Sequence, residues 1–239
     1  MSDLLLELFS EEIPARLQSK AEENLKKIVS KELLQVNSNF EAIESFSTPR
    51  RLILVVTGLS EKTQPEPLEK RGPNVLAAEK AISGFCKSMG ILPSQLLKKD
   101  EKKGQFFYAR IEKTSKLNSE IIPEILSRVL KEFPWPKSMR WGSGSFKWVR
   151  PLRSVICLLY DDTECKILPL KLEGISSGNM SSGPRFLSAN KFAVSSFEDY
   201  QEKMRHRYVI FDRTARKERI WTEASNLAFA VGLELVEDE

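Results

Sequence analysis

Apolar and polar positions follow two different rhythms along the first sixty residues. A nearly continuous apolar run at residues 3–9 is typical of a buried strand, and a run rich in Val and Ile at 51–59 predicts a second strand. Between them, apolar residues recur at steps of three and four positions, which predicts a helix from Pro14 to about Asn37. A short strand at 41–47 completes an expected order of strand, helix, strand, strand.

The middle of the chain combines charged connections with two more helices. Residues 61–73 are rich in proline and charge and predict an exposed connection without regular structure, while residues 98–104 predict a charged loop. Apolar residues at helical spacing predict helices at 75–89 and 118–133. Side chains of alternating character predict a half-buried strand at 105–113.

The last third of the chain is predicted to contain short strands and two helices. The expected elements are strands at 152–160 and 166–172 that pair as a hairpin, a loop of small residues at 174–183, strands at 192–194 and 208–211, and helices that start at Phe197 and Thr214. Basic residues crowd the start of the last helix and oppose its dipole. An acidic partner or an anion is therefore expected there.

Strand pairs joined by short turns outnumber strand–helix–strand crossovers in this pattern. The expected fold class is therefore α+β, with mixed or mostly antiparallel sheets and packed helices. We expect an N-terminal α+β subdomain over residues 1–65 and a second α+β subdomain over 66–195 that carries a basic Trp/Arg segment. A terminal helical segment over 196–239 is expected to begin a following domain. Insertion of one sheet into the other is an alternative to this division.

The composition is that of a globular protein. Of the 239 residues, 41% are hydrophobic and 29% are charged, which argues against disordered, collagen-like and coiled-coil classes. The longest apolar runs are far shorter than the roughly 20 residues that cross a bilayer, so neither a membrane span nor a signal peptide is expected. Three scattered cysteines fit a reducing, cytoplasmic setting better than a disulfide framework or a zinc site.

Positive charge is unevenly distributed along the chain. The net charge is only +4, but the segment from Phe133 to Tyr160 contains no acidic residue and combines five lysines and arginines with three tryptophans. A guanidinium group binds phosphate in a bidentate manner and an indole ring stacks on bases, so this segment has the composition of a nucleic-acid surface. Alternatively, the tryptophans anchor the core and the arginines pair with acidic helices.

Few residues are candidates for bond-making chemistry. His206 is the single histidine and lies between two arginines, so it is expected to be a surface residue and not a general base. No phosphate-binding loop with its lysine occurs. The amides of residues 142–145 could hold an anion, but this segment lacks the lysine at the required offset and is a weak signal for such a site. Glu11 and Glu12 are explained as acids at a helix start. We therefore expect no catalytic residue and no metal site.

Six segments form a recognisable series along the chain. They are Leu6–Pro14, Thr48–Leu52, Glu69–Pro73, Pro136–Gly142, Phe146–Leu152, and Ser177–Asn179 continuing to Gly183–Phe186. In order and approximate spacing, the series resembles the N-terminal part of the beta subunit of bacterial heterotetrameric glycyl-tRNA synthetase. One departure is that the family usually has histidine at the position of Pro184.

The resemblance implies a larger protein of which this chain is the N-terminal part. In that family a separate alpha subunit activates glycine with ATP and Mg²⁺, and the beta subunit holds the tRNA within an assembly of two alpha and two beta subunits. The implied role is support of tRNA(Gly) binding and alpha-subunit assembly in the cytoplasm, with no catalytic residue and no cofactor bound by this chain. A free-standing RNA-binding module and a non-catalytic scaffold are the alternatives.

The candidate contact residues belong to these segments and to the basic segment. They are basic or aromatic side chains that are expected to contact tRNA or the alpha subunit: Arg50, Arg51, Arg71, Lys137, Arg140, Trp141, Arg150, Arg153 and Arg185.

Overall fold

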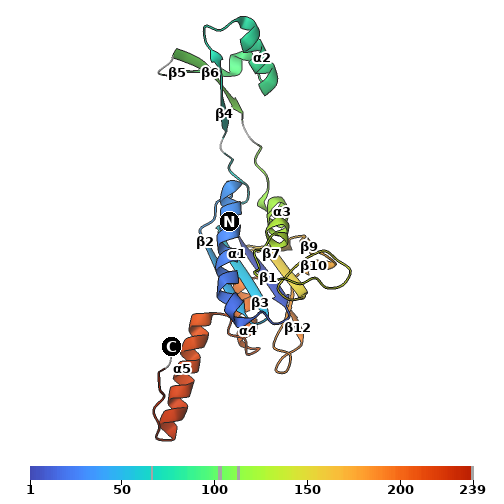
Figure 1. The fold of residues 1–239 in the computed structure, drawn as a ribbon, viewed down its shortest axis with the longest axis vertical. Helices are drawn as coiled ribbons and strands as arrows, with labels where there is room; N and C mark the ends of the chain where they lie inside the picture. Colours follow the sequence, from blue (N-terminus) through green and yellow to red (C-terminus); the bar gives the residue numbers. More distant parts are fainter. Residues whose placement is uncertain (66, 102–103, 112–113, 238–239) are drawn as a thin grey trace. The chain divides into compact units, whose positions relative to one another are not determined.

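The chain is described by a computed structural model that covers residues 1–65, 67–101, 104–111 and 114–237 (Figure 1). It divides into two compact units. Unit 1 comprises residues 1–61 and 117–239, and unit 2 comprises residues 62–116. Unit 2 is therefore an insertion into the sequence of unit 1.

Unit 1 is built on one large sheet. Its strands are β1 (Ser2–Ser10), β2 (Ala42–Thr48), β3 (Arg51–Leu59), β7 (Leu152–Tyr160), β8 (Cys165–Ile167), β9 (Lys171–Leu172) and β10 (Ile175–Gly178). The order across the sheet is β2-β3-β1-β7-β10-β9, and β8 also pairs with β7. The pair of β10 with β7 is parallel, and the other pairs are antiparallel.

Both faces of this sheet are covered. The covering elements are helices α1 (Ala15–Gln35) and α3 (Asn118–Lys131) on one face, and helix α4 (Phe197–Arg205) with the hairpin of β11 (Met180–Ser182) and β12 (Lys191–Ala193) on the other. Leu4 and Leu6 of β1 join the core with α1 and α3, whereas Leu5 joins the core with α4. Burial on both faces explains why β1 is an almost uninterrupted apolar run. Each fully buried leucine contributes about 1.5–3 kcal/mol.

An aromatic cluster fixes the long segment between α3 and β7 to this core. Trp148 is fully buried, and its ring centroid lies 5.1 Å from that of Phe133 and 5.0 Å from that of Trp135. Trp141 is half-buried and meets Phe146 edge-on at 5.7 Å. The tryptophans therefore anchor the core, which was the alternative to base stacking.

Unit 2 is a small α+β unit. Its elements are strands β4 (Leu68–Asn74), β5 (Leu96–Glu101) and β6 (Gly104–Ile111), helix α2 (Glu79–Met89) and the short 3-10 helix η1 (Pro93–Gln95). The strands form an antiparallel sheet in the order β4-β6-β5. Among its described residues, the buried apolar side chains are those of Cys86 and Ala109. Its core is thus far smaller than that of unit 1.

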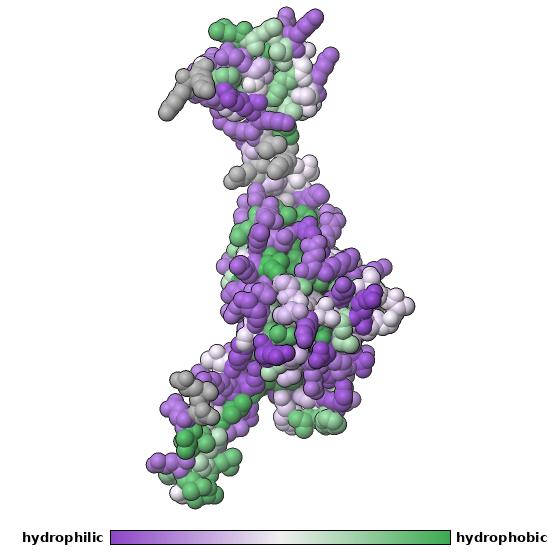
Figure 2. All heavy atoms as spheres, viewed as in Figure 1, coloured by the Kyte–Doolittle hydropathy of each residue, from purple (hydrophilic) through white to green (hydrophobic). Residues whose placement is uncertain are grey.

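The last helix of the chain, α5 (Arg213–Ala230), follows α4. Asp212 caps it, because its carboxylate accepts hydrogen bonds from the backbone N of Thr214 (2.8 Å) and of Ala215 (3.3 Å). This carboxylate is the acidic partner expected at that helix start. None of residues 213–230, all of them described, is buried, and apolar side chains such as Phe229 are exposed. Figure 2 shows hydrophobic residues on the surface of this C-terminal segment.

The α+β fold class is confirmed, and so are the long elements. The predicted strands at 3–9, 51–59 and 152–160 and the helices at 14–37 and 118–133 correspond to elements with nearly the same bounds. The strand predicted at 105–113 is β6, although residues 112 and 113 lie outside the described residues. The helix predicted at 75–89 starts later, at Glu79.

Several short elements were predicted wrongly. The expected connection at 61–73 contains β4, and the expected charged loop at 98–104 overlaps β5, with residues 102 and 103 outside the described residues. Both strands are rich in charge because much of their surface is exposed. The expected loop at 174–183 contains β10 and β11, the strand expected at 166–172 is divided between β8 and β9, and residues 208–211 form no strand.

The structure groups the segments differently from the predicted division at residues 65 and 195. Strand β7 pairs with β1 over almost its full length, which joins the segment after residue 117 to the first sixty residues. Tyr200 and Met204 of α4 are fully buried against the same sheet, so α4 also belongs to unit 1. Of the helices in the described ranges, none combines the length and apolar character that crossing a bilayer needs.

Cysteine alkylation is expected to report the two units separately. Cys86 lies in α2 and Cys157 in β7, both buried, whereas Cys165 is exposed. Burial also raises the pKa of Cys157 to about 12, which keeps that thiol protonated at neutral pH. Because unit 2 has the smaller core, iodoacetamide should modify Cys165 first, Cys86 at low urea and Cys157 only at higher urea, as followed by peptide mass spectrometry. Modification of Cys86 and Cys157 at the same urea concentration would contradict independent units.

Candidate functional site

A pocket of about 460 Å³ lies at the end of the unit 1 sheet where β1 finishes and β3 and β7 begin. The β11–β12 hairpin forms its other wall. The basic side chains that line it are Arg50, Arg153, Arg185 and Lys191, and the other lining residues include Phe9, Ser181 and Ser182. Chain segments far apart in sequence thus bring four positive charges to one place.

Glu11 lies at the centre of three of these arginines. Its carboxylate oxygens are 3.1 Å from Nε of Arg153, 3.3 Å from a terminal nitrogen of Arg185 and 3.5 Å from a terminal nitrogen of Arg50. One negative charge is therefore shared by three positive ones, and Lys191 adds a fourth. The pocket keeps an excess of positive charge.

The crowding of guanidinium groups affects Arg50 most directly. Burial lowers the pKa of Arg50, the Glu11 carboxylate opposes that effect, and the charges of Arg185, Arg51 and Arg153 lower the pKa further. An arginine nevertheless stays protonated in proteins, so the repulsion between Arg50 and the neighbouring arginines persists in the folded state. A further anion in the pocket would relieve this repulsion.

A buried ion pair supports the pocket from below. Nε of Arg51 lies 3.6 Å from Oε1 of Glu7, and the two side chains are 5% and 1% exposed. The Ser181 hydroxyl lies 2.9 Å and 2.8 Å from the two Glu7 oxygens, and Arg51 donates to the backbone O of Ser182. Burial raises the pKa of Glu7, while Arg51, Ser181 and Tyr200 act in the opposite direction. This cluster ties β1, β3 and β11 together.

Phe9 contacts both Arg50, which lines the pocket, and Arg51, which lies beneath it. The guanidinium carbons of Arg50 and Arg51 lie 4.6 Å and 4.5 Å from the centroid of its ring. Cation–π contacts of this kind hold a guanidinium over the ring face while leaving its edge free to donate hydrogen bonds. Arg50 also donates from Nε to the backbone O of Ser10 at 3.2 Å.

Four of the nine predicted contact residues meet at this site, and five do not. Arg50, Arg153 and Arg185 line the pocket and Arg51 lies beneath it. Arg71 belongs to unit 2, and Lys137, Arg140 and Arg150 are exposed on the segment that precedes β7, where Trp141 packs against Phe146.

Sequence reasoning missed the acids and the polar residues of the site. Glu11 was assigned to a helix start, but α1 begins at Ala15 with no acid in its first turn, and Glu11 instead binds three arginines. A related correction concerns residues 142–145. The anion held there is the chain's own Glu173, which accepts hydrogen bonds from the backbone N and the hydroxyl of Ser145, both at 2.9 Å.

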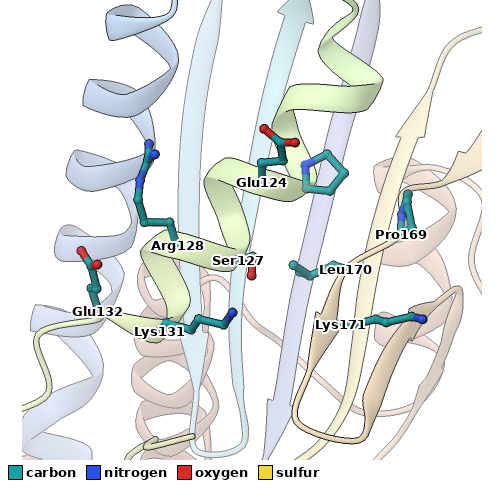
Figure 3. A pocket seen from close by; sticks show the side chains of 9 residues that line it. Glu124, Ser127, Arg128, Lys131, Glu132, Pro169, Leu170 and Lys171 are labelled. Atoms are coloured by element: carbon teal, nitrogen blue, oxygen red, sulfur yellow. The ribbon is translucent and has the colours of Figure 1, made fainter.

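A second hollow, of about 520 Å³, lies between α3 and residues 169–171 (Figure 3). Its charged side chains have both signs, and Arg128 points away from Leu170 to pair with Glu32 of α1. Because no single charge dominates, it offers less to an ionic ligand than the arginine-lined pocket. Within the described residues, no cluster of three His, Cys, Asp or Glu side chains fits a metal ion.

Comparison with known proteins identifies the family. Residues 4–239 match the family model described as glycyl-tRNA synthetase beta subunit. The chain belongs to that family. It is 48% identical over 239 residues to the glycine–tRNA ligase beta subunit of Paracoccus denitrificans, covering all of this chain and 35% of that protein. It is also 47% identical to the corresponding subunit of Cereibacter sphaeroides and 44% identical to that of a Ruegeria species.

The chain spans about a third of the length of these beta subunits. Four of the six segments that resemble the family meet at the pocket. Leu6–Pro14 supplies Glu7, Phe9 and Glu11, Thr48–Leu52 supplies Arg50 and Arg51, Phe146–Leu152 ends at the pocket wall, and Gly183–Phe186 supplies Arg185. Segments that carry the resemblance are thus brought together at one site in this chain.

The buried pair can be tested by substitution. Glu7→Ala leaves the Arg51 charge buried without its partner, so a loss of about 3–5 kcal/mol is expected in the free energy of unfolding by urea. Replacing both residues by leucine should cost less than Glu7→Ala alone. Glu44→Ala, on an exposed position of β2, is the control and should change stability by less than about 0.5 kcal/mol. Equal losses in the two variants would contradict the assignment.

The same pair predicts a pH dependence. Because the pKa of Glu7 is raised in the folded protein, the folded form retains a proton that the unfolded chain has already released. The Glu7 contribution to stability should therefore fall as pH rises from the ordinary glutamate range to the raised pKa. Glu7→Gln has no such group, so the stability of the wild type minus that of the variant should decrease with pH. An increase would show that Arg51 outweighs burial.

Proposed function

We propose that this chain is the part of a glycine–tRNA ligase beta subunit that supports tRNA(Gly) binding and assembly with the alpha subunit in the cytoplasm. The alpha subunit, using ATP and Mg²⁺, would activate glycine, and this chain would bind and position without reacting atoms of its own. The observation that carries the proposal is the convergence of four basic side chains on a pocket that holds one carboxylate.

The chemistry of the pocket suits a phosphate group. A guanidinium donates two parallel hydrogen bonds to phosphate oxygens, and the edges of Arg153 and Arg185 are available because both side chains are 60% exposed. Arg50 is more enclosed and is held by Phe9, so it supplies charge from a fixed position. A backbone phosphate of tRNA can therefore bind at the pocket mouth, with Glu11 as the competing anion.

Potentially reactive groups are poorly placed for catalysis. The Glu7 carboxylate is sealed in the core, and the high pKa of the Cys157 thiol opposes nucleophilic chemistry. His206 is 65% exposed at the end of α4, 3.8 Å from Glu202. These features support a binding role for this chain and a catalytic role for its partner subunit.

The exposed cations before β7 are the second part of the proposal. Lys137, Arg140 and Arg150 lie on a segment that Trp148 anchors to the core. Within the described part of the chain, these three side chains form no salt bridge, so their charges remain available to tRNA or to acidic groups of the alpha subunit.

A structural scaffold is the competing function. It is favoured by the three ion pairs of Glu11, which show that the pocket arginines already have an internal partner. A scaffold would need Glu11 for stability, whereas a phosphate site would bind better without it.

The two functions give opposite results in the full-length beta subunit assembled with its alpha subunit. Arg153→Gln with Arg185→Gln should weaken tRNA(Gly) binding and reduce the slope of log K against log salt by about 1.5, because roughly 0.7 to 0.9 is lost per phosphate contact. Glu11→Gln should tighten binding. Arg16→Gln with Arg205→Gln, two exposed arginines of α1 and α4, is the control of equal charge. Unchanged affinity in the Glu11 and pocket variants, together with lower stability, would favour the scaffold.

A second pair of substitutions tests the exposed segment. Arg140→Ala with Arg150→Ala should lower either tRNA affinity or the yield of the alpha–beta complex, measured by fluorescence titration and by size-exclusion chromatography with light scattering. If both stay at the wild-type level, the segment has no part in either contact.

A further inference from the structure

The two units differ in net charge, although the net charge of the whole chain is small. Residues 62–116 contain twelve lysines and arginines against six acidic residues, a net charge of +6. Because the whole chain carries +4, unit 1 carries −2 despite its arginine-lined pocket. A small unit with so large an excess of positive charge attracts polyanions over several ångströms.

Basic side chains occur on all three strands of the unit 2 sheet. Lys70 and Arg71 lie on β4, Lys98 and Lys99 on β5, and Arg110 on β6, and all five are exposed. Figure 2 shows hydrophilic side chains projecting from this unit. The charge is therefore displayed on the sheet itself and not confined to its loops.

The central strand adds aromatic rings to this charge. Phe106, Phe107 and Tyr108 follow one another in β6, and all three are half-buried. The Arg71 guanidinium lies 3.9 Å from the centroid of Phe106, and Lys99 Nζ lies 5.3 Å from that of Tyr108. Rings flanked by cations are the combination that binds unpaired nucleotides, with bases on the rings and phosphates on the cations.

Strand register places aromatic and basic residues on the same face of the unit 2 sheet. Tyr108 pairs with Arg71 of β4 and with Leu97 of β5, and Phe106 pairs with Lys99, so these five side chains share a face. Helix α2 packs on the other face, where a Cβ at Gly72 would meet Phe85 at 2.5 Å and where Ala109 is buried.

The face opposite α2 is accessible. Leu97 is 41% exposed, and the side chains of Arg71 and Lys99 are 47% and 46% exposed. Two acids on this face compete for the cations: Glu101 lies 3.0 Å from Arg71 and Glu69 lies 2.5 Å from Lys99. Exposed pairs contribute only about 0–1 kcal/mol each, so phosphates can replace them.

We propose that this face of unit 2, formed by Arg71, Leu97, Lys99, Phe106 and Tyr108, binds an unpaired RNA segment. Bases stack on Phe106 and Tyr108, and phosphates bind Arg71 and Lys99. Unpaired RNA is favoured over a duplex because stacked base pairs do not expose base faces to a ring. The inference rests on the proposed function, since it assigns a second part of the tRNA contact to a unit other than the one that contains the pocket.

The test uses the whole 239-residue chain and a fluorescent oligouridylate of about twelve nucleotides, a length within the range that aromatic grooves bind. Anisotropy titrations at several salt concentrations should show binding that weakens steeply with salt, and weaker binding of a duplex RNA of equal length. Arg71→Gln with Lys99→Gln should lower the slope of log K against log salt by about 1.4, at roughly 0.7 per contact. Phe106→Leu and Tyr108→Leu should each weaken binding about tenfold with little change in that slope.

Controls separate this inference from a general effect of charge or unfolding. Lys26→Gln with Lys31→Gln removes two exposed lysines from α1 and should leave oligouridylate binding unchanged. Protection of Cys86 from alkylation shows that unit 2 remains folded in each variant. Equal losses in the α1 control and the unit 2 variant would overturn the inference, as would an absence of binding by the wild-type chain at low salt.

The pocket variants distinguish failure here from failure of the proposed function. If Arg153→Gln with Arg185→Gln weakens tRNA(Gly) binding in the full complex while the unit 2 variants bind oligouridylate normally, the inference is wrong and the proposed function stands. If the unit 2 variants bind RNA normally but lose assembly with the alpha subunit, the face docks protein and the inference is also wrong.

Discussion

The pocket of unit 1 depends on one buried ion pair. Glu7 lies in β1 opposite Ile53 of β3 and Ile156 of β7. It is retained among these apolar residues by Arg51 of β3 and Ser181 of β11. Such a pair contributes little net stability, because desolvation of two charges offsets their attraction. The pair instead fixes positions. Glu7 holds Arg51, which is next to Arg50 in the sequence, and it also binds Ser181 of the β11–β12 hairpin. The pocket walls are thereby held in register with the sheet.

The two units differ in how far their basic side chains are paired with acids. In unit 1, several arginines are paired with acids that come from distant segments, such as Arg213 with Glu22 and Arg153 with Glu11. Unit 2 has half as many acids as bases, so pairing leaves much of its charge uncompensated. A chain of modest net charge thus contains one region with many internal ion pairs and another with an excess of positive charge.

The sequence was sufficient for elements whose pattern is set by burial. Strands β1, β3 and β7 are buried on both faces, and helices α1 and α3 on one, so their apolar periods are long and clear. Strands β4 and β5 were missed because their exposed faces carry charges that resemble those of a loop, and β9 is two residues long. Insertion of one sheet into the other was an open alternative, but its bounds could not be predicted, because pairing of β7 with β1 is a contact between residues about 150 positions apart that no local pattern records.

The arginines of the candidate site could be predicted from the sequence, but the role of Glu11 could not. Arginines were chosen for phosphate chemistry, which selects residue type and not spatial neighbours, so it included Arg71 of unit 2 beside Arg153 of the pocket. Glu11 was overlooked because a carboxylate just before a helix already has a simple explanation. Yet the carboxylate decides what the pocket can do. Three guanidinium groups surround one half-buried acid, and a phosphate would bring more oxygens and more charge than the acid it displaces. In the proposed function, Glu11 is thus the counter-ion of the three arginines that an incoming phosphate would displace.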